Sequence, residues 1–178
     1  MTSEWNDYQN NETAGTSNSA KWRIDQLNLK RFAGQDKTLL EIGANQGQFA
    51  IELSPVFKHI TAVEPFVPTP KLPENVSWFK KGFKEFIIET GETYDVVFSF
   101  ATSREIRNND KLHEGHIVRG HYDLVKPDGI LVYETHLLDR EGVQIHNHIM
   151  LNSFIELFDM EIESGTSRNK RRYYIFKK

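Results

Sequence analysis

The stretch that decides the fold is Thr38-Leu-Leu-Glu-Ile-Gly-Ala-Asn-Gln-Gly-Gln-Phe49. Its first five residues form a short apolar run typical of a buried strand, and a glycine turn and a helical pattern follow directly. Gly43 and Gly47 allow the backbone to approach a ligand closely, and the first residues of the next helix have N–H groups without partners in the helix. The segment therefore predicts a strand, a ligand-binding turn and a helix.

Strand and helix signals alternate along the rest of the chain. Apolar runs predict further strands over residues 59–64, 76–80, 94–100 and 129–135, with a closing hairpin over 160–163 and 172–176. Helical periodicity predicts helices over residues 20–33, 47–53, 84–89, 113–125 and 147–158. Such alternation favours a doubly wound α/β fold with helices on both faces of a largely parallel sheet, and ligands then bind at the carboxyl ends of the strands.

The composition limits both the organisation and the chemistry. The chain has 178 residues, 22 Lys plus Arg against 25 Asp plus Glu, a net charge of -3 and no cysteine. We expect a flexible arm over residues 1–19 and a single domain over 20–178, in a cytoplasmic protein without a membrane partner, because neither a leader pattern nor a long apolar run is present. The lack of cysteine excludes disulfides, thiolate zinc sites and a cysteine nucleophile.

An acidic residue at the end of the second strand points to a nucleoside ligand. Glu64 can accept hydrogen bonds from both hydroxyls of a ribose, as in dinucleotide-binding folds. The glycine spacing, however, is G-x-x-x-G rather than G-x-G-x-x-G. Asn45 stands where a middle glycine is expected, and asparagine tolerates positive φ. This favours a ligand that has an adenosine but no pyrophosphate.

At these residues the chain resembles the class I S-adenosylmethionine-dependent methyltransferases. The resemblance extends over residues 38–178 and includes AVEPF, YDVVFSF, HYDLVKPDGILVYETH and the closing hairpin. It implies a Rossmann-like, seven-stranded sheet in the order 3-2-1-4-5-7-6 with strand 7 antiparallel. It also implies S-adenosylmethionine as the cofactor and a transferase activity.

The resemblance assigns cofactor contacts by position. The methionine end would lie against the first strand and turn, at Glu41, Gly43, Ala44, Asn45, Gln46, Gly47 and Phe49. Glu64 would hold the ribose, Pro65, Phe66, Gly82 and Phe83 would lie beside the adenine, and Ser99, Phe100 and Ala101 would pass under the cofactor. Phe83 stands where the family often has an acidic residue, so recognition there would use stacking or the backbone.

The sequence limits the range of possible methyl acceptors mainly by excluding some of them. Without cysteine, a covalent adduct on a pyrimidine ring is impossible, and SFATSRE lacks the Asn/Asp-Pro-Pro-aromatic loop of adenine amino methyltransferases. Glu134 and His136 end the fifth strand, and His136 has the chemistry to deprotonate a hydroxyl group. Our first hypothesis is therefore methyl transfer to a heteroatom, chiefly a hydroxyl oxygen, of a small molecule or sugar, with Glu134 and His136 as the catalytic residues.

Several alternatives stay open at this stage. The basic residues after 167 would suit an RNA methyltransferase, although a nucleic acid partner is less favoured because the chain is acidic overall. A non-catalytic cofactor-binding module and, more distantly, an NAD-linked reductase are further alternatives.

Arg104 and Arg107 would hold an anionic or sugar substrate or form a solvated loop. We expect no metal, although three histidines lie close in sequence, His113, His116 and His121. The aromatic residues Trp5, Tyr8 and Trp22 would form a lid or pack on the sheet edge.

Overall fold

The computed structural model describes residues 17–135, 141–167 and 171–178 of the chain. Within them, one seven-stranded sheet has the order β3-β2-β1-β4-β5-β7-β6. The strands span β1 (Gly34–Ile42), β2 (Phe57–Val63), β3 (Val76–Phe79), β4 (Tyr94–Phe100), β5 (Val125–Glu134), β6 (Met160–Thr166) and β7 (Arg172–Lys177). The first five pair in parallel, and β7 is antiparallel to both of its neighbours. The predicted strand order and the antiparallel seventh strand are confirmed.

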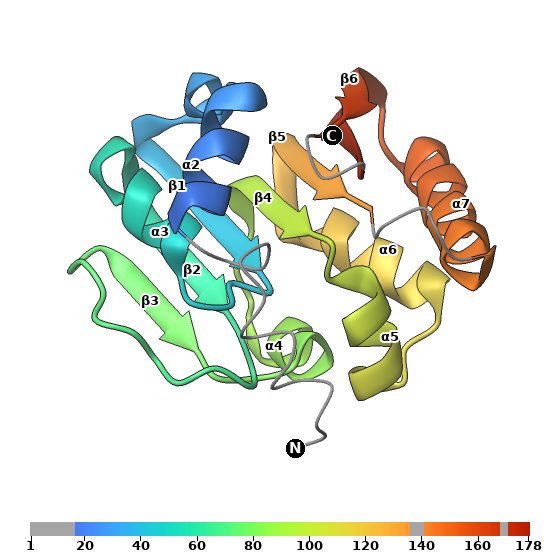
Figure 1. Cartoon of the computed structure of the whole chain (residues 1–178), viewed down its shortest axis with the longest axis horizontal. Helices are drawn as coiled ribbons and strands as arrows, with labels where there is room; N and C mark the ends of the chain where they lie inside the picture. The colour runs from blue at the N-terminus through green and yellow to red at the C-terminus, as the bar shows by residue number, and fades with distance from the viewer. Residues whose placement is uncertain (1–16, 136–140, 168–170) are drawn as a thin grey trace.

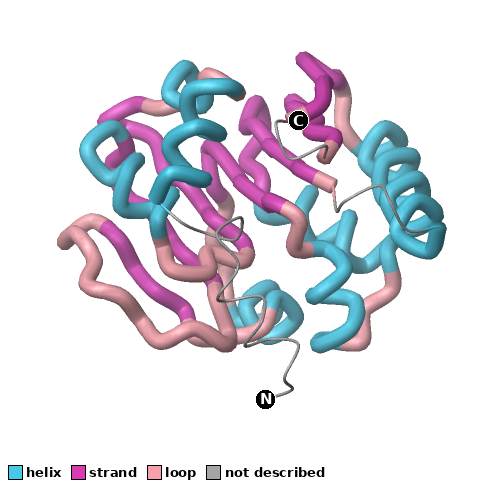
Figure 2. Tube along the Cα trace, viewed as in Figure 1, coloured by secondary structure: helices cyan, strands magenta, loops and turns pink. Residues whose placement is uncertain are grey.

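Helices cover both faces of the sheet, as predicted. One face is covered by α2 (Ser17–Gln26) and α3 (Gln48–Leu53), and the other by α4 (Phe83–Glu89), α5 (Ser103–Asp110), α6 (Glu114–Leu124) and α7 (Glu141–Leu157). Two short 3-10 helices, η1 (Leu29–Phe32) and η2 (Ser54–Val56), precede β1 and β2. Figure 1 shows the labelled elements, and Figure 2 shows the strands running between the helices.

The central strands form the core because both of their faces are covered. Leu39 and Leu40 of β1 are fully buried on opposite faces, and Val96 and Val97 of the adjacent β4 repeat this arrangement. A strand buried on both sides has an almost continuous apolar sequence, which explains why these runs were recognisable. The described residues include no helix that is long and apolar enough to cross a membrane.

The structure corrects the sequence analysis at the N-terminal helix and at the start of two strands. The single helix expected over 20–33 is two elements, α2 and η1, because Asn28 has a left-handed backbone with φ 46°. β1 begins at Gly34 rather than residue 38. β5 begins at Val125 rather than residue 129, and it contains an irregularity where Asp128 has φ 62° and the register with β4 shifts.

Two helices also differ from the prediction. Residues 103–110, where we considered a loop, form α5, which is mostly polar and buries only Ser103 and Ile106. α7 begins at Glu141 instead of residue 147. Its buried side includes Met150 and Phe154, whereas Ile155 is 52% exposed, because residues four apart, not adjacent ones, share a helix face.

His121 is a buried part of this core. Its Nδ1 lies 2.7 Å from the Ile117 carbonyl and its Nε2 lies 2.9 Å from Ser99 Oγ. Its ring also contacts Phe83 and Phe154. Burial lowers the pKa of His121 to about 4. The neutral form is therefore favoured in the folded state.

This burial predicts a specific dependence of stability on pH. The unfolded chain takes up the His121 proton below about pH 6.5 and the folded chain only near 4, so stability is complete above 6.5 and falls as the pH drops through this window. In urea unfolding, the wild type should lose about 3 kcal/mol more than His121→Leu between these limits. Replacement of the exposed His148 by Leu is the control and should keep the wild-type slope. Equal slopes for wild type and His121→Leu would contradict this account.

Candidate functional site

The turn after β1 combines three left-handed residues. Gly43, Asn45 and Gly47 have φ of 74°, 49° and 72°. The positive φ expected for Asn45 is confirmed. A Cβ on Gly43 would lie 2.1 Å from Cγ2 of Thr102, so this position accepts only glycine without a shift of the loop after β4. The turn is thus fixed both by its own backbone and by the neighbouring strand end.

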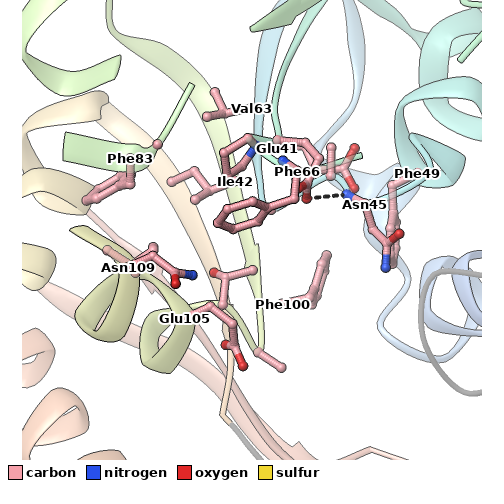
Figure 3. A pocket seen from close by; sticks show the side chains of 18 of the residues that line it. Glu41, Ile42, Asn45, Phe49, Val63, Phe66, Phe83, Phe100, Glu105 and Asn109 are labelled. Atoms are coloured by element: carbon pink, nitrogen blue, oxygen red, sulfur yellow. Dashed lines mark hydrogen bonds between the residues drawn. The ribbon is translucent and has the colours of Figure 1, made fainter. Parts of the chain in front are cut away.

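Glu64 joins this turn to the loop after β2. Its Oε2 accepts a hydrogen bond of 3.0 Å from the Asn45 N–H, which Figure 3 marks with a dashed line. Its Oε1 accepts hydrogen bonds from the N–H groups of Phe66 (2.9 Å) and Val67 (3.4 Å). Burial raises the pKa of Glu64, and these N–H donors offset part of that rise. Each carboxylate oxygen has capacity for further donors.

A cavity lies at the carboxyl ends of β1, β2 and β4, and its empty space, the part open to solvent included, is about 990 Å³. This is the position where ligands bind in parallel α/β sheets. Most of the predicted cofactor residues line it, namely Glu41, Gly43, Ala44, Asn45, Phe49, Glu64, Pro65, Phe66, Gly82, Phe83, Phe100 and Ala101. In Figure 3, Phe83 and Asn109 lie toward one end, Asn45 and Phe49 toward the other, and Glu105 between them.

Three predicted cofactor residues do not line the cavity. Ser99 is fully buried behind it and binds Thr102 Oγ1 at 2.9 Å. Gly47 faces Trp78 and Pro70 on the outer side of the turn, and Gln46 is exposed. Gln46 and Gly47 therefore belong to the part of the turn that faces away from the cavity, and Ser99 supports the loop after β4 from behind the cavity wall.

The wall near the glycine turn has polar atoms without internal partners. Glu41 Oε2 and Asn45 Oδ1 are buried and have no hydrogen-bond partner among the described residues. Burial raises the pKa of Glu41 to about 8, and the charge of Glu64 adds to this shift. Buried polar groups are normally satisfied, so these two atoms point to a polar ligand at this end of the cavity.

The opposite end is bordered by α4 and α5 and combines the aromatic side chain of Phe83 with polar side chains of α5. Gly82 and Phe83 line it from the start of α4, with the Phe83 ring 4.9 Å from that of His121. Asn109 and Asp110 line it from the end of α5. Asp110 Oδ2 also accepts a hydrogen bond of 2.9 Å from the Lys84 N–H. Sequence reasoning missed both α5 residues because it did not predict that helix.

A buried ion cluster lies on the side of β5 and β7. Arg23 of α2 donates two hydrogen bonds to Glu134, from Nε to Oε2 at 3.1 Å and from Nη2 to Oε1 at 3.0 Å. Arg171 Nη1 lies 3.5 Å from the same Oε1. Arg23 and Arg171 line the cavity, whereas the fully buried Glu134 lies behind them. The sequence analysis singled out Glu134 but not its partners.

Glu105 contributes a second carboxylate to this part of the cavity. It lies in the first turn of α5 and lines the cavity. Burial raises its pKa to about 7, although the positive charges of Arg104 and Arg171 oppose the rise. Of the arginines considered as substrate ligands, Arg107 instead pairs with Glu114 at 3.0 Å, and neither Arg104 nor Arg107 lines the cavity.

The remaining predicted residues are placed as follows. His136, Trp5 and Tyr8 lie outside the described residues. Trp22 packs against the Arg23 guanidinium, with 4.7 Å from Cζ to the ring centroid. Among the residues that the structure covers, no group of three His, Cys, Asp or Glu side chains could hold a metal ion. His121, in particular, faces the core as described above.

Comparison with known proteins identifies the family. A family model described as a methyltransferase domain matches residues 20–164. The chain belongs to this methyltransferase family. The predicted family, enzyme class and cofactor are thereby confirmed, and S-adenosylmethionine is the methyl donor. A comparison with functionally curated proteins gives no match.

Solved structures of methyltransferases share the fold. The N-methyltransferase NodS from Bradyrhizobium japonicum WM9, in complex with S-adenosyl-L-homocysteine, has a TM-score of 0.67 at 16% identity, with 98% of this chain and 96% of that chain covered. A putative S-adenosylmethionine-dependent methyltransferase from Listeria monocytogenes has a TM-score of 0.67 at 12% identity, with 89% of this chain and 99% of that chain covered. An rRNA methylase from Streptococcus thermophilus has a TM-score of 0.60 at 10% identity, with 87% of this chain and 94% of that chain covered. At these identities the likeness concerns the fold alone.

The cavity has the chemistry that S-adenosylmethionine requires. The buried Glu41 Oε2 and Asn45 Oδ1 would accept hydrogen bonds from the amino acid end. Glu64 would accept ribose hydroxyls in addition to its backbone donors, and the end at Phe83 would take the adenine. Cations are favoured near carboxylates, and the donor carries both an ammonium and a sulfonium. The residues present therefore fit this cofactor.

The ribose assignment predicts a loss of cofactor affinity when Glu64 is changed. Glu64→Ala should weaken binding of S-adenosyl-L-homocysteine roughly 5- to 150-fold in isothermal titration, because it leaves polar groups of the ligand and of the Asn45 turn unpaired. Glu52→Ala, which removes a partly exposed carboxylate of α3 paired with Lys21, should bind as the wild type does. Unchanged affinity of a folded Glu64→Ala protein would place the ribose elsewhere.

Proposed function

We propose that this methyltransferase transfers the methyl group to a heteroatom, chiefly a hydroxyl oxygen, of a small molecule or sugar. The observation that carries this proposal is the cavity itself. This one cavity has to hold both the cofactor and the acceptor, and concave sites of this kind suit small ligands. Arg23, Glu105 and Arg171 line the same cavity, and we place the acceptor beside these side chains.

The protein would act mainly by alignment. When bound, S-adenosylmethionine supplies an activated methyl group for in-line displacement by the acceptor heteroatom. Glu64 and the Asn45 turn would hold the nucleoside, and Glu41 would hold the amino acid end. Thr102 packs against Gly43 and fixes the loop after β4 on the acceptor side. This arrangement would keep the acceptor in line with the methyl group.

The proposed catalytic residues have different roles. We keep His136 as the group that takes the proton of the acceptor hydroxyl, because in the sequence it comes two residues after the end of β5. Glu134 is fully buried, and both of its oxygens accept hydrogen bonds from Arg23. We therefore propose that Glu134 is a positioning residue that orients Arg23 and Arg171, instead of exchanging a proton with the acceptor.

The contacts of the C-terminal basic residues give little support to RNA as the acceptor. Lys177 pairs with Asp128 at 2.9 Å. Lys178 donates hydrogen bonds of 2.8 Å to the carbonyl oxygens of Tyr122 and Val125. Arg171 faces Glu134 and the cavity. Side chains engaged in this way do not form the continuous basic surface that phosphate recognition needs.

The proposal predicts which acceptors are labelled. With donor carrying an isotopic methyl group, the protein should label members of a pool of small hydroxylated compounds and sugars, and should leave tRNA and rRNA unlabelled. His136→Ala should slow this transfer far more than it weakens binding of S-adenosyl-L-homocysteine, while the control His148→Ala should leave both unchanged. Label found only in RNA would overturn the small-molecule proposal, and a full rate for His136→Ala would remove His136 as the base.

A further inference from the structure

The acceptor side of the cavity has an uneven distribution of charge. Two arginines, Arg23 and Arg171, line it, and the carboxylate of Glu134 lies behind both. Arg23 uses Nε and Nη2 in a paired interaction with both oxygens of Glu134. Such a bidentate pair is the strong form of the arginine–carboxylate interaction. The negative charge of Glu134 therefore mainly balances the positive charge of Arg23.

Arg171 is left with a weaker internal partner. Its Nη1 lies 3.5 Å from Glu134 Oε1, which is the oxygen that already accepts from Arg23 Nη2 at 3.0 Å. Its Nε is buried and has no hydrogen-bond partner among the described residues. Only 15% of the Arg171 side chain is exposed. A guanidinium that is mostly removed from water and incompletely paired at a cavity wall is a site for an anion.

We propose that Arg171, supported by Arg23, binds an oxyanion group of the methyl acceptor, a carboxylate or a phosphate. This inference deepens the proposed function, on which it rests, by naming the chemical class of the acceptor. The planar fork of a guanidinium presents N–H donors that match two oxygens of such a group. Glu134 fixes the position of both arginines, and the glycine turn lies across the same cavity, so a bound oxyanion would hold the rest of the acceptor near the methyl donor.

Glu105 would control the strength of this site. With Glu105 ionised, the four side chains Arg23, Arg171, Glu134 and Glu105 sum to zero charge, and with Glu105 protonated they sum to +1. Because burial raises the pKa of Glu105 to about 7, anion affinity should fall as the pH rises through about 7. The groups that act on the charge of Glu105 are Arg104 of α5, Arg171 before β7 and Tyr133 of β5, and Arg23 of α2 lines the same cavity.

Anion binding can be measured on the full chain saturated with S-adenosyl-L-homocysteine. Acetate and inorganic phosphate are titrated separately, with chloride at matched ionic strength, while the side-chain N–H signals of arginine are followed by NMR. We expect a saturable shift of the Arg171 signal with at least one of the two probes at pH 6. The pH comparison uses acetate, which keeps a single charge from pH 6 to 8, and we expect a lower affinity at pH 8 and a tighter complex at pH 8 for Glu105→Gln. The probe that saturates at the lower concentration indicates whether a carboxylate or a phosphate is preferred.

Variants identify the binding residue. Arg171→Ala should abolish the saturable response, and Arg171→Lys should retain part of it, which separates loss of charge from loss of folding. Arg172→Ala removes the adjacent exposed arginine and should leave the response unchanged. An unchanged response in Arg171→Ala, an equal loss in Arg172→Ala, or no saturable response with either probe would overturn the proposal.

A second assay separates this inference from the proposed function. The hydroxylated pool is divided into compounds with a carboxylate or phosphate and their uncharged ester or unphosphorylated counterparts. We expect methyl transfer to the anionic members, with at least about a tenfold loss in Arg171→Ala at unchanged affinity for S-adenosyl-L-homocysteine. Equal transfer to the neutral members, insensitive to Arg171→Ala, would refute anion recognition and leave the small-molecule function standing. Label in RNA alone would refute the proposed function.

Discussion

The pairing of the buried Glu134 carboxylate with Arg23 and Arg171 is the interaction that arranges one wall of the cavity. It ends β5 in the middle of the sheet, and it joins α2 near the start of the described chain to the segment before β7 near its end. Removing one partner of a buried ion pair costs about 3 to 5 kcal/mol, because the remaining charge stays desolvated. The same interaction that ties both ends of the fold to the sheet therefore sets the charge of the cavity wall.

The opposite wall depends on backbone geometry instead of charge pairing. The left-handed turn at Gly43, Asn45 and Gly47 brings N–H groups and a side-chain amide to the end of β1. Glu64 ties this turn to the loop after β2 through its three backbone donors. The wall proposed for the cofactor is thus held by hydrogen bonds to the backbone, whereas the wall proposed for the acceptor is built from long ionisable side chains. This division is consistent with a common donor and an acceptor particular to the individual enzyme.

The cofactor side was predictable from the sequence because its signals are local. Glycine and asparagine at positions of positive φ, an acidic residue at a strand end and apolar strands all depend on neighbouring residues. These signals located the turn, Glu64 and most strands, whereas the strand order and the other cavity contacts were implied by the resemblance to the class I methyltransferases. The acceptor side was not predictable, because Arg23, Glu134 and Arg171 meet only through tertiary structure. Two signals were present, however. An arginine stands between Trp22 and Ile24 in the N-terminal helix, and a glutamate ends the apolar run of β5. A charged side chain at either position would be buried and would therefore need an oppositely charged partner.

The helix α5 was missed for a different reason. Its sequence SREIRNND is polar, and only Ser103 and Ile106 face the core, so the segment has little apolar periodicity. The helix forms because tertiary packing overrides weak local preference. Because the sequence analysis did not predict this helix, the expected site lacked Glu105, Asn109 and Asp110, although all three line the cavity.

A crystal structure of the protein with S-adenosyl-L-homocysteine tests the central claim most directly. The account predicts the ribose at Glu64, the amino acid end at Glu41 and Asn45, the adenine beside Phe83, and the sulfur facing the wall formed by Arg23, Glu105 and Arg171. A ligand bound outside this cavity, or a sulfur directed away from that wall, would contradict it.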